Sequence, residues 1–366
     1  MEGYGNKEFI RMNSNNYLGL ALNKEVIEAG EKAAREFGTG PGAARFISGT
    51  FRPHLELEKR LARFHGREAG MIFSSGYATV MGVIVPLVSR DTIVISDELN
   101  HNSIINAIRL SRARDKKIYH HNHMNGLESG IRESIGNCQR VIIISDGIFS
   151  MRGDHAPLPE IAGLAEKYYA EFEEGILTVI DDAHGVGVIG KTGRGTTELT
   201  GEDRIDIIIG TFGKAMGVNG GYIVSDARIV EYLRETAPFY VYSNPITPSE
   251  ASAALKAMEI IDSEPGRELL RYLKEMADYF RARLVELGYE VIKGEHPIVP
   301  LLVRDTRQTK QLIKYLKDNG ILATGLSYPV VPRGEEEIRF QVCADHTRHD
   351  LDFVLEVLSQ FKQANG

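Results

Sequence analysis

Residues 177–187, LTVIDDAHGVG, combine a short apolar run with acidic, histidine and glycine residues directly after it. Four similar β-rich runs recur along the chain, each followed by turn residues and then by a helical pattern. Strands that are apolar along their whole length are typical of a sheet covered by helices on both faces. The pattern therefore predicts an α/β fold with a mostly parallel central sheet. The five expected strands are Met71–Phe73, Thr92–Ile95, Val141–Ile144, Leu177–Ile180 and Ile205–Ile209.

The order of predicted helices and strands changes after about Pro245. Two long helical stretches follow, the first over Pro248–Asp262 and the second ending near Leu287. A strand-like run, Ile298–Arg304, and two further amphipathic helices complete the chain. This order predicts an N-terminal arm over residues 1–22, a large domain over 23–244 and a smaller α+β domain over 245–366.

Composition excludes several classes of protein. The 366 residues are 43% apolar and 25% charged, which is typical of a globular domain rather than a disordered chain. A formal charge of −7 disfavours a nucleic-acid binder, which needs a basic surface. No apolar stretch approaches the ~20 residues that a membrane span requires. Two cysteines and the absence of a signal peptide favour the reducing cytoplasm.

One motif matches a known nucleotide-binding pattern outside its structural context. Gly185–Thr192, GVGVIGKT, satisfies the phosphate-loop pattern G-x-x-x-x-G-K-[ST]. A phosphate loop must open a helix, but Gly193 and Gly195 would stand in the first turn of that helix. We therefore expect these glycines to form a turn that lies close to neighbouring backbone.

Four groups of residues with possible chemical roles lie just after predicted strands, where α/β sheets place their sites. Asp181 and His184 follow one strand, and Lys214 lies in a glycine-bracketed turn after another. Ser74–Tyr77 joins a strand to a helix, and His101 follows a fourth strand. Each has an ordinary explanation alone: a surface lysine, a turn aspartate, an N-cap or an interior histidine. Together they supply an imine-forming amine, an anion for a ring nitrogen, phosphate donors and a stacking ring, which is what pyridoxal 5′-phosphate (PLP) requires.

The chain resembles the α-oxoamine synthase family, within the fold-type-I superfamily of PLP-dependent transferases. The resemblance extends over nearly the whole length and rests on many motifs in one order. These are NSNNYLGL (Asn13–Leu20), GTGPGAARFISGT, ISDELNHNSII, DGIFSMRGD, DDAHGVG, GTFGKAMG and YPVVPRGEEEIRFQVCADHT.

The resemblance implies a role for each matching residue around the cofactor. Lys214 would form the imine with PLP and then act as the general base, and Asp181 would pair with the pyridine nitrogen. His101 would stack on the ring, while His184 and Ser150 would hydrogen-bond the phenolic oxygen.

Further residues match the positions that hold the phosphate and the substrate. Gly76, Tyr77 and Thr211 would bind the phosphate, and Ser243 and Asn244 would reach it from the second subunit of a homodimer. Substrate-binding residues would be Asn16, Ser150 and Arg339, the last holding the carboxylate of the amino acid.

The family joins an amino acid to an acyl-CoA. Among its activities, the motifs DGIFSM, YSN and YPVVP are nearest to the glycine C-acetyltransferase pattern, so we expect glycine and acetyl-CoA as substrates. The alternative is 8-amino-7-oxononanoate synthase, which acts on L-alanine and a pimeloyl thioester. An aminotransferase or an inactive scaffold subunit on the same fold is disfavoured, because the family motifs, Lys214 and Asp181 are all present. A short lysine loop, GKAMGVNGGY, and a short arm leave acyl specificity open.

Two charged segments are expected to lie on the surface. His120, His121 and His123 have no carboxylate or thiolate close by in sequence, so we expect a surface turn and no metal site. The basic run Arg109–Lys117 is expected to be a solvated helix face.

Overall fold

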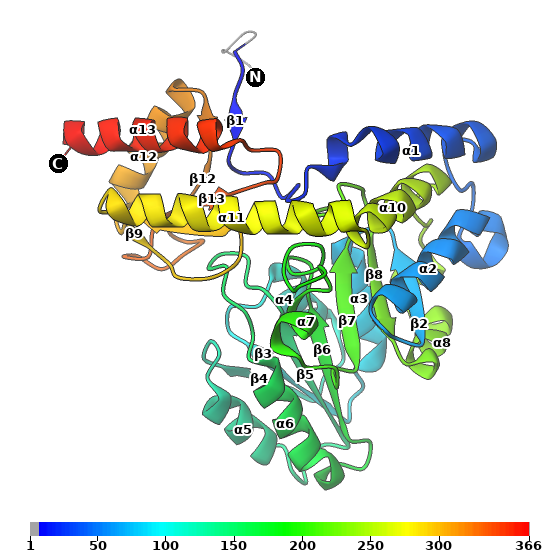
Figure 1. Ribbon diagram of the computed structural model, residues 1–366. Helices are drawn as coiled ribbons and strands as arrows, with labels where there is room; N and C mark the ends of the chain where they lie inside the picture. Colours follow the sequence, from blue (N-terminus) through cyan, green and yellow to red (C-terminus); the bar gives the residue numbers. More distant parts are fainter. Residues whose placement is uncertain (1–6, 366) are drawn as a thin grey trace. The chain divides into compact units, whose positions relative to one another are not determined.

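The computed structural model describes residues 7–365, which separate into two compact units (Figure 1). The large unit comprises residues 20–149 and 155–267. The small unit comprises the described residues up to Gly19, the short segment Ser150–Asp154 and the chain from Glu268 onward. Residues 1–6 of the predicted arm lie outside the described residues.

The large unit is built on a seven-stranded sheet in the order β2-β8-β7-β6-β5-β3-β4. Six strands run parallel to one another, and only β8 is antiparallel to its neighbours. The predicted mostly parallel α/β sheet is therefore confirmed. The strands are β2 (Ala69–Phe73), β3 (Thr92–Asp97), β4 (Asp115–Tyr119), β5 (Arg140–Asp146), β6 (Ile176–Asp181), β7 (Ile207–Thr211) and β8 (Gly221–Ser225).

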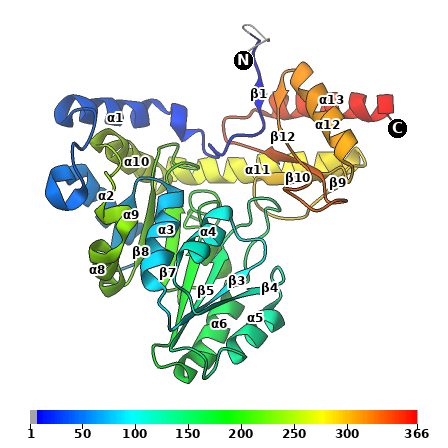
Figure 2. The ribbon, with the colours of Figure 1, turned by 180° about the vertical axis from the view of Figure 1, so that it is seen from behind.

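Both faces of this sheet are buried, which explains why its strands are apolar throughout. Ile144 and Val179 pack on one face in a cluster that includes side chains of α3 and α4. Their sequence neighbours Ile143 and Ile180 point to the opposite face and are also fully buried. Figure 2 shows α3 and α4 in front of the sheet.

Several helices of the large unit carry identifiable caps. Thr247 begins α10 with a reciprocal capping box to Glu250, and the Ser75 hydroxyl caps α3. No helix within residues 7–365 is long and apolar enough to cross a bilayer. The helices are α1 (Lys24–Phe37), α2 (Arg52–Phe64), α3 (Gly76–Leu87), α4 (Asn102–Leu110), α5 (Met124–Arg132), α6 (Leu158–Tyr168), α7 (Thr196–Thr200), α8 (Ala227–Thr236), α9 (Pro238–Val241) and α10 (Pro248–Ile261), with short turns η1 (Leu20–Leu22), η2 (Arg45–Gly49) and η3 (Tyr169–Glu171).

One sequence expectation is corrected in this unit, and a second agrees with the structure. The basic run Arg109–Lys117 is not one helix face, because Asp115–Lys117 belong to the edge strand β4. The glycine-rich segment after β6 is a series of turns, and the next helix, α7, has only five residues. The phosphate-loop interpretation is thus rejected by the structure as well as by the sequence.

The small unit contains a four-stranded antiparallel sheet in the order β12-β13-β10-β9. Its core includes an edge-to-face contact between Phe280 and Phe340, with ring centroids 5.4 Å apart. The N-terminal arm belongs here, because the N–H of Gln341 donates to Met12 O and that of Ala344 donates to Tyr17 O. The elements are β1 (Ile10–Arg11), α11 (Glu264–Glu286, mostly in this unit), β9 (Glu290–Val291), β10 (Ile298–Leu302), α12 (Thr306–Asp318), β11 (Ile321–Leu322), β12 (Thr324–Leu326), β13 (Glu337–Gln341) and α13 (Arg348–Asn365).

Candidate active site

The large unit gathers three of the predicted catalytic residues near the carboxyl ends of its parallel strands. Asp181 is the last residue of β6 and is buried, Lys214 lies in the turn after β7, and His101 is the N-cap of α4. Burial raises the pKa of Asp181, while the charges of Lys214 and His101 and a hydrogen bond from Ala183 N lower it. Asp181 is therefore a desolvated acid whose charged form is favoured by Lys214 and by the hydrogen bond from Ala183 N.

The ring of His101 is fixed by hydrogen bonds at its own helix start. Its Nδ1 lies 2.7 Å from the Ser103 hydroxyl and accepts the Ser103 main-chain N–H at 3.2 Å. Loss of solvent and the charge of Lys214 lower the pKa of His101, and Asp181 opposes this shift. The geometry favours a neutral imidazole with its hydrogen on Nε2.

The start of α3 offers main-chain donors for a phosphate group. Ser75 Oγ accepts the N–H of Ala78, so the first N–H groups of the helix, those of Gly76 and Tyr77, have no acceptor within the helix. Thr211 lies against this turn, since a Cβ on Gly76 would stand 3.2 Å from its hydroxyl oxygen. That hydroxyl donates to Gly220 O at 2.9 Å in this structure. The arrangement fits a phosphate dianion.

His184 lies in a buried turn directly after β6. The N–H groups of Gly185 and Val186 both donate to Asp182 O at 3.0 Å and close this turn. The structure thus places His184 three residues beyond Asp181 on the same connection, as the sequence predicts.

Sequence reasoning missed two buried polar residues beside these groups. Asp146, the last residue of β5, accepts the main-chain N–H of His101 on Oδ2 at 3.0 Å. Asn100 accepts the N–H of Asp146 at 2.8 Å and donates to Ile144 O at 2.9 Å. The signal was present, because Asp146 follows an apolar run just as Asp181 does.

Arg339 lies in the small unit, and only part of its guanidinium is hydrogen-bonded among the described residues. Nη1 donates to Ser150 O at 2.9 Å, whereas Nε is buried and has no hydrogen-bond partner among the described residues. A buried guanidinium N–H without an acceptor is costly, so this donor fits a carboxylate ligand. Asn15 and Gln341, which sequence reasoning also missed, are hydrogen-bonded side chain to side chain beside Arg339.

The remaining predicted residues fall at three places. Ser150 belongs to the small unit, where its carbonyl binds Arg339. Asn16 lies in the arm, and its carbonyl accepts the N–H of Gly19. Ser243 and Asn244 follow α9, where the Ser243 hydroxyl donates to Asn244 O. Tyr242, just before them, is 83% exposed.

The histidine segment is paired with acids that are distant in sequence. Nδ1 of His120 lies 3.1 Å from Glu98 Oε2, and Nδ1 of His121 lies 3.2 Å from Asp97 Oδ1. Within residues 7–365, the one compact trio of metal-ligand types is Cys343, Asp345 and His346. There His346 Nδ1 already accepts the N–H of Cys343.

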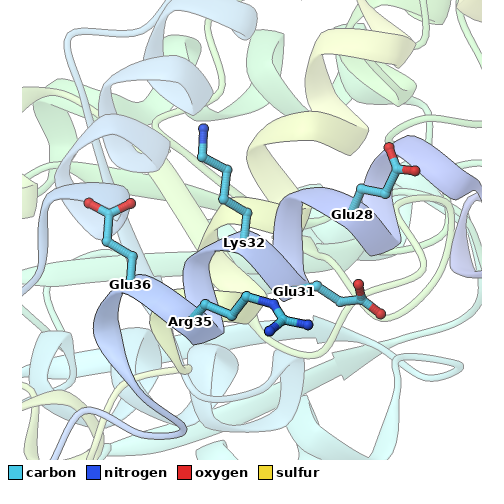
Figure 3. A pocket seen from close by; sticks show the side chains of 5 residues that line it. All are labelled: Glu28, Glu31, Lys32, Arg35 and Glu36. Carbon is cyan, nitrogen blue, oxygen red and sulfur yellow. The ribbon is translucent and has the colours of Figure 1, made fainter.

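A separate hollow runs along α1 in the large unit (Figure 3). Its lining consists of charged residues of both signs on one solvated helix, and it contains none of the predicted site residues. The lining side chains are Glu28, Glu31, Lys32, Arg35 and Glu36.

Comparisons with known proteins identify relatives over almost the whole chain. The family model described as aminotransferase class I and II matches residues 7–358. An 8-amino-7-oxononanoate synthase of Bacillus velezensis is 42% identical and covers 95% of this chain and 87% of its own. One of Petrotoga mobilis is 41% identical, covering 98% and 90%. A serine palmitoyltransferase of Sphingomonas wittichii superposes with a TM-score of 0.92 at 28% identity, covering 97% and 88%.

These comparisons correct the expected substrates. The relatives at 41–42% identity are 8-amino-7-oxononanoate synthases, so the expectation of glycine and acetyl-CoA as substrates is wrong. The fold and cofactor expectations are confirmed: the chain belongs to the α-oxoamine synthase family of PLP-dependent acyltransferases, on the fold of the class I and II aminotransferases.

Proposed function

We propose that this enzyme is an 8-amino-7-oxononanoate synthase, which joins L-alanine to a pimeloyl thioester and releases carbon dioxide and the thiol. One observation carries the proposal: eight relatives with this activity in their names are 40–42% identical over 95–98% of the chain. A pimeloyl group carried by CoA or by a carrier protein would serve the same chemistry.

In this proposal the large unit, together with Ser150 of the small unit, supplies the groups that hold the cofactor. The N–H groups of Gly76 and Tyr77, with the Thr211 hydroxyl, bind the phosphate. Asp181 pairs with the ring nitrogen, His101 stacks on the ring, and His184 with Ser150 hydrogen-bonds the phenolic oxygen. When bound, PLP withdraws electrons from the Cα of the amino acid and makes its proton acidic.

The protein's own groups then handle the substrate. Arg339 binds the carboxylate through its free Nε–H, and Asn16 lies near the same carboxylate. Lys214 Nζ takes the Cα proton, a role suited to an amine that is partly removed from water. The neutral His101 keeps a proton on Nε2 that it can donate to the thioester oxygen.

The proposal also includes a homodimer, in which a second copy of the chain contributes residues to each active site. The segment around η2 and α9 exposes large apolar side chains in the described chain, with Phe46 68% and Tyr242 83% exposed. A buried ion pair, Arg45 with Glu58 at 3.0 Å, holds η2 in place beneath them. An apolar surface on a rigid support fits an isologous contact. The dimer would bring Ser243 and Asn244 to the phosphate of the partner's cofactor.

A matrix of amino acids and acyl thioesters tests the proposed function. L-Alanine with pimeloyl-CoA is expected to give the fastest thiol release and a product that has lost carbon dioxide by mass. Lys214→Ala should abolish turnover and the visible absorbance of bound PLP. Preference for L-serine with palmitoyl-CoA would overturn the assignment while leaving the family intact.

A further inference from the structure

The site contains a second acid beside Asp181, on the neighbouring strand. Asp146 of β5 and Asp181 of β6 are register partners in the parallel sheet. Side chains alternate along a strand, so Asp146 lies on the same face as Ile144, and Asp181 on the same face as Val179. Both of these apolar residues pack in the cluster with α3 and α4. The two carboxyl groups therefore emerge side by side at one edge of the sheet.

Both carboxyl groups are withdrawn from water, with residue exposures of 5% for Asp146 and 7% for Asp181. Each accepts one main-chain N–H: Asp146 from His101 at 3.0 Å, and Asp181 from Ala183 at 3.2 Å. Two adjacent carboxylates in such a place cannot both be charged without a large electrostatic penalty, so the pair retains a proton.

We propose that Asp146 carries this proton in the working enzyme, as a neutral acid that positions His101 and leaves Asp181 as the single anion for the cofactor's ring nitrogen. The proposal rests on the PLP site above and not on the identity of the acyl substrate. Asp146 is a positioning residue here, because it acts through the N–H of His101.

The surrounding charges support this distribution. Burial and the charge of Asp181 raise the pKa of Asp146 well above its usual range, and Asp97 of β3 adds to the increase. Lys214, after β7, and the N–H of His101, at the start of α4, oppose it. Lys214 is the main group that favours the anion of Asp181, whereas at Asp146 the charge of Asp181 outweighs that of Lys214, so the proton is better placed on Asp146.

Infrared difference spectroscopy of the PLP-loaded enzyme tests where the proton resides. The spectrum of wild type minus that of Asp146→Asn should contain a protonated-carboxyl stretch at neutral pH, because the variant lacks this group. In Asp181→Asn the neighbouring charge is gone, so the midpoint at which this stretch disappears should fall by at least one pH unit. Asp97→Asn is the matched control at a strand end beside His121; the protonated-carboxyl stretch should remain in this variant, with a midpoint that falls less than in Asp181→Asn. A wild-type minus Asp146→Asn spectrum with carboxylate bands alone would overturn the proposal.

Cofactor affinity gives a second readout that needs no substrate. Asp146→Ala removes the acceptor for the His101 N–H and should weaken PLP binding about tenfold in equilibrium titration of the apoprotein. Asp146→Asn retains an acceptor oxygen, so it should weaken PLP binding less than threefold. Equal weakening in both variants would mean that the charge matters, and would also overturn the proposal. Should Asp146→Ala fold poorly, the infrared result on Asp146→Asn decides. Failure of the alanine–pimeloyl reaction would leave these measurements unaffected.

Discussion

The carboxylate of Asp182 accepts hydrogen bonds from both the main-chain N–H and the hydroxyl of Thr196, the former at 2.7 Å. The surrounding space is made by glycines, because a Cβ at Gly147, Gly185 or Gly195 would lie well inside van der Waals contact with this carboxylate. Asp182 is fully buried. It thus closes the glycine-rich turns that follow the strand carrying Asp181.

The pH dependence of stability should report this buried acid. Burial raises the pKa of Asp182 to about 7 from its usual value of 3.8. The folded protein therefore keeps a proton that the unfolded chain releases, and stability falls as pH rises from about 4 to about 7. Asp182→Asn should remove this contribution, up to about 1.4 kcal/mol per pH unit, in urea unfolding of the apoprotein at pH 5 to 8. Parallel pH profiles of the unfolding free energy for wild type and Asp182→Asn would contradict this prediction.

Arg339→Lys should weaken binding of the amino acid more than it slows the chemistry. Lysine keeps the charge but loses the planar N–H fork, including the buried Nε donor that lacks a partner among the described residues. We expect KM for the amino acid to rise about tenfold or more, with a smaller change in kcat, in steady-state assays. Arg304→Lys, at a surface pair with Glu290, is the matched control and should leave KM unchanged. A KM equal to wild type in Arg339→Lys would exclude the carboxylate role.

Glu337 should make carboxylate binding depend on pH. It lies two residues before Arg339 on β13, hence on the same face, and burial raises its pKa to about 7 despite the nearby Arg339 and Arg152. Above pH 7 its negative charge repels a carboxylate ligand, and below pH 7 that repulsion disappears. Glu337→Gln should therefore lower KM for the amino acid about three- to tenfold at pH 8 and flatten its pH profile. An unchanged slope between pH 6 and 8 would refute this.

The apolar strands in the middle of the sheet could be predicted from sequence, whereas the exposed edge strand β4 and the buried strand β8 could not. Val141–Ile144 and Leu177–Ile180 are apolar throughout and lie in the middle of the sheet. The edge strand β4, DKKIY, has one fully buried residue, Tyr119, so it carries no apolar run. β8 follows a glycine turn and runs antiparallel, which local pattern does not reveal.

The individual site residues could be predicted, but their partners depend on strand order. Asp181, Lys214 and His101 each follow a strand, and sheet geometry sends such residues to one edge. The contact of Asp146 with His101 requires β5 to lie next to β3, across 45 residues of sequence. The substrate was misjudged for a different reason: acyl groups differ by contacts worth ~1–3 kcal/mol, which the shared cofactor motifs do not contain.

Two glycines with positive φ near the end of the glycine-rich segment after β6 should respond differently to alanine. Gly195 and Gly201 both have positive φ, +86° and +68°, but only Gly195 lies against other atoms, the carboxylate of Asp182 and the main chain of Val186. Alanine at Gly201 should destabilise by about 1–2 kcal/mol from backbone conformation alone. Gly195→Ala should cost at least about 2 kcal/mol more, because its ψ of −154° lies outside the left-handed helical region of Gly201 and its Cβ would overlap the carboxylate of Asp182.

A double mutant then tests whether the Asp182 side chain causes the extra destabilisation by Gly195→Ala. Asp182→Ala empties the space that the Cβ of Gly195→Ala would enter, so the two changes together should destabilise by clearly less than the sum of the single effects. The free energies of unfolding in urea give this coupling directly, with Gly201→Ala in the Asp182→Ala background as the pair expected to be additive. If Gly195→Ala were equally additive with Asp182→Ala, the cost at Gly195 would arise from its backbone alone, and Asp182 would not be the residue that requires a glycine there.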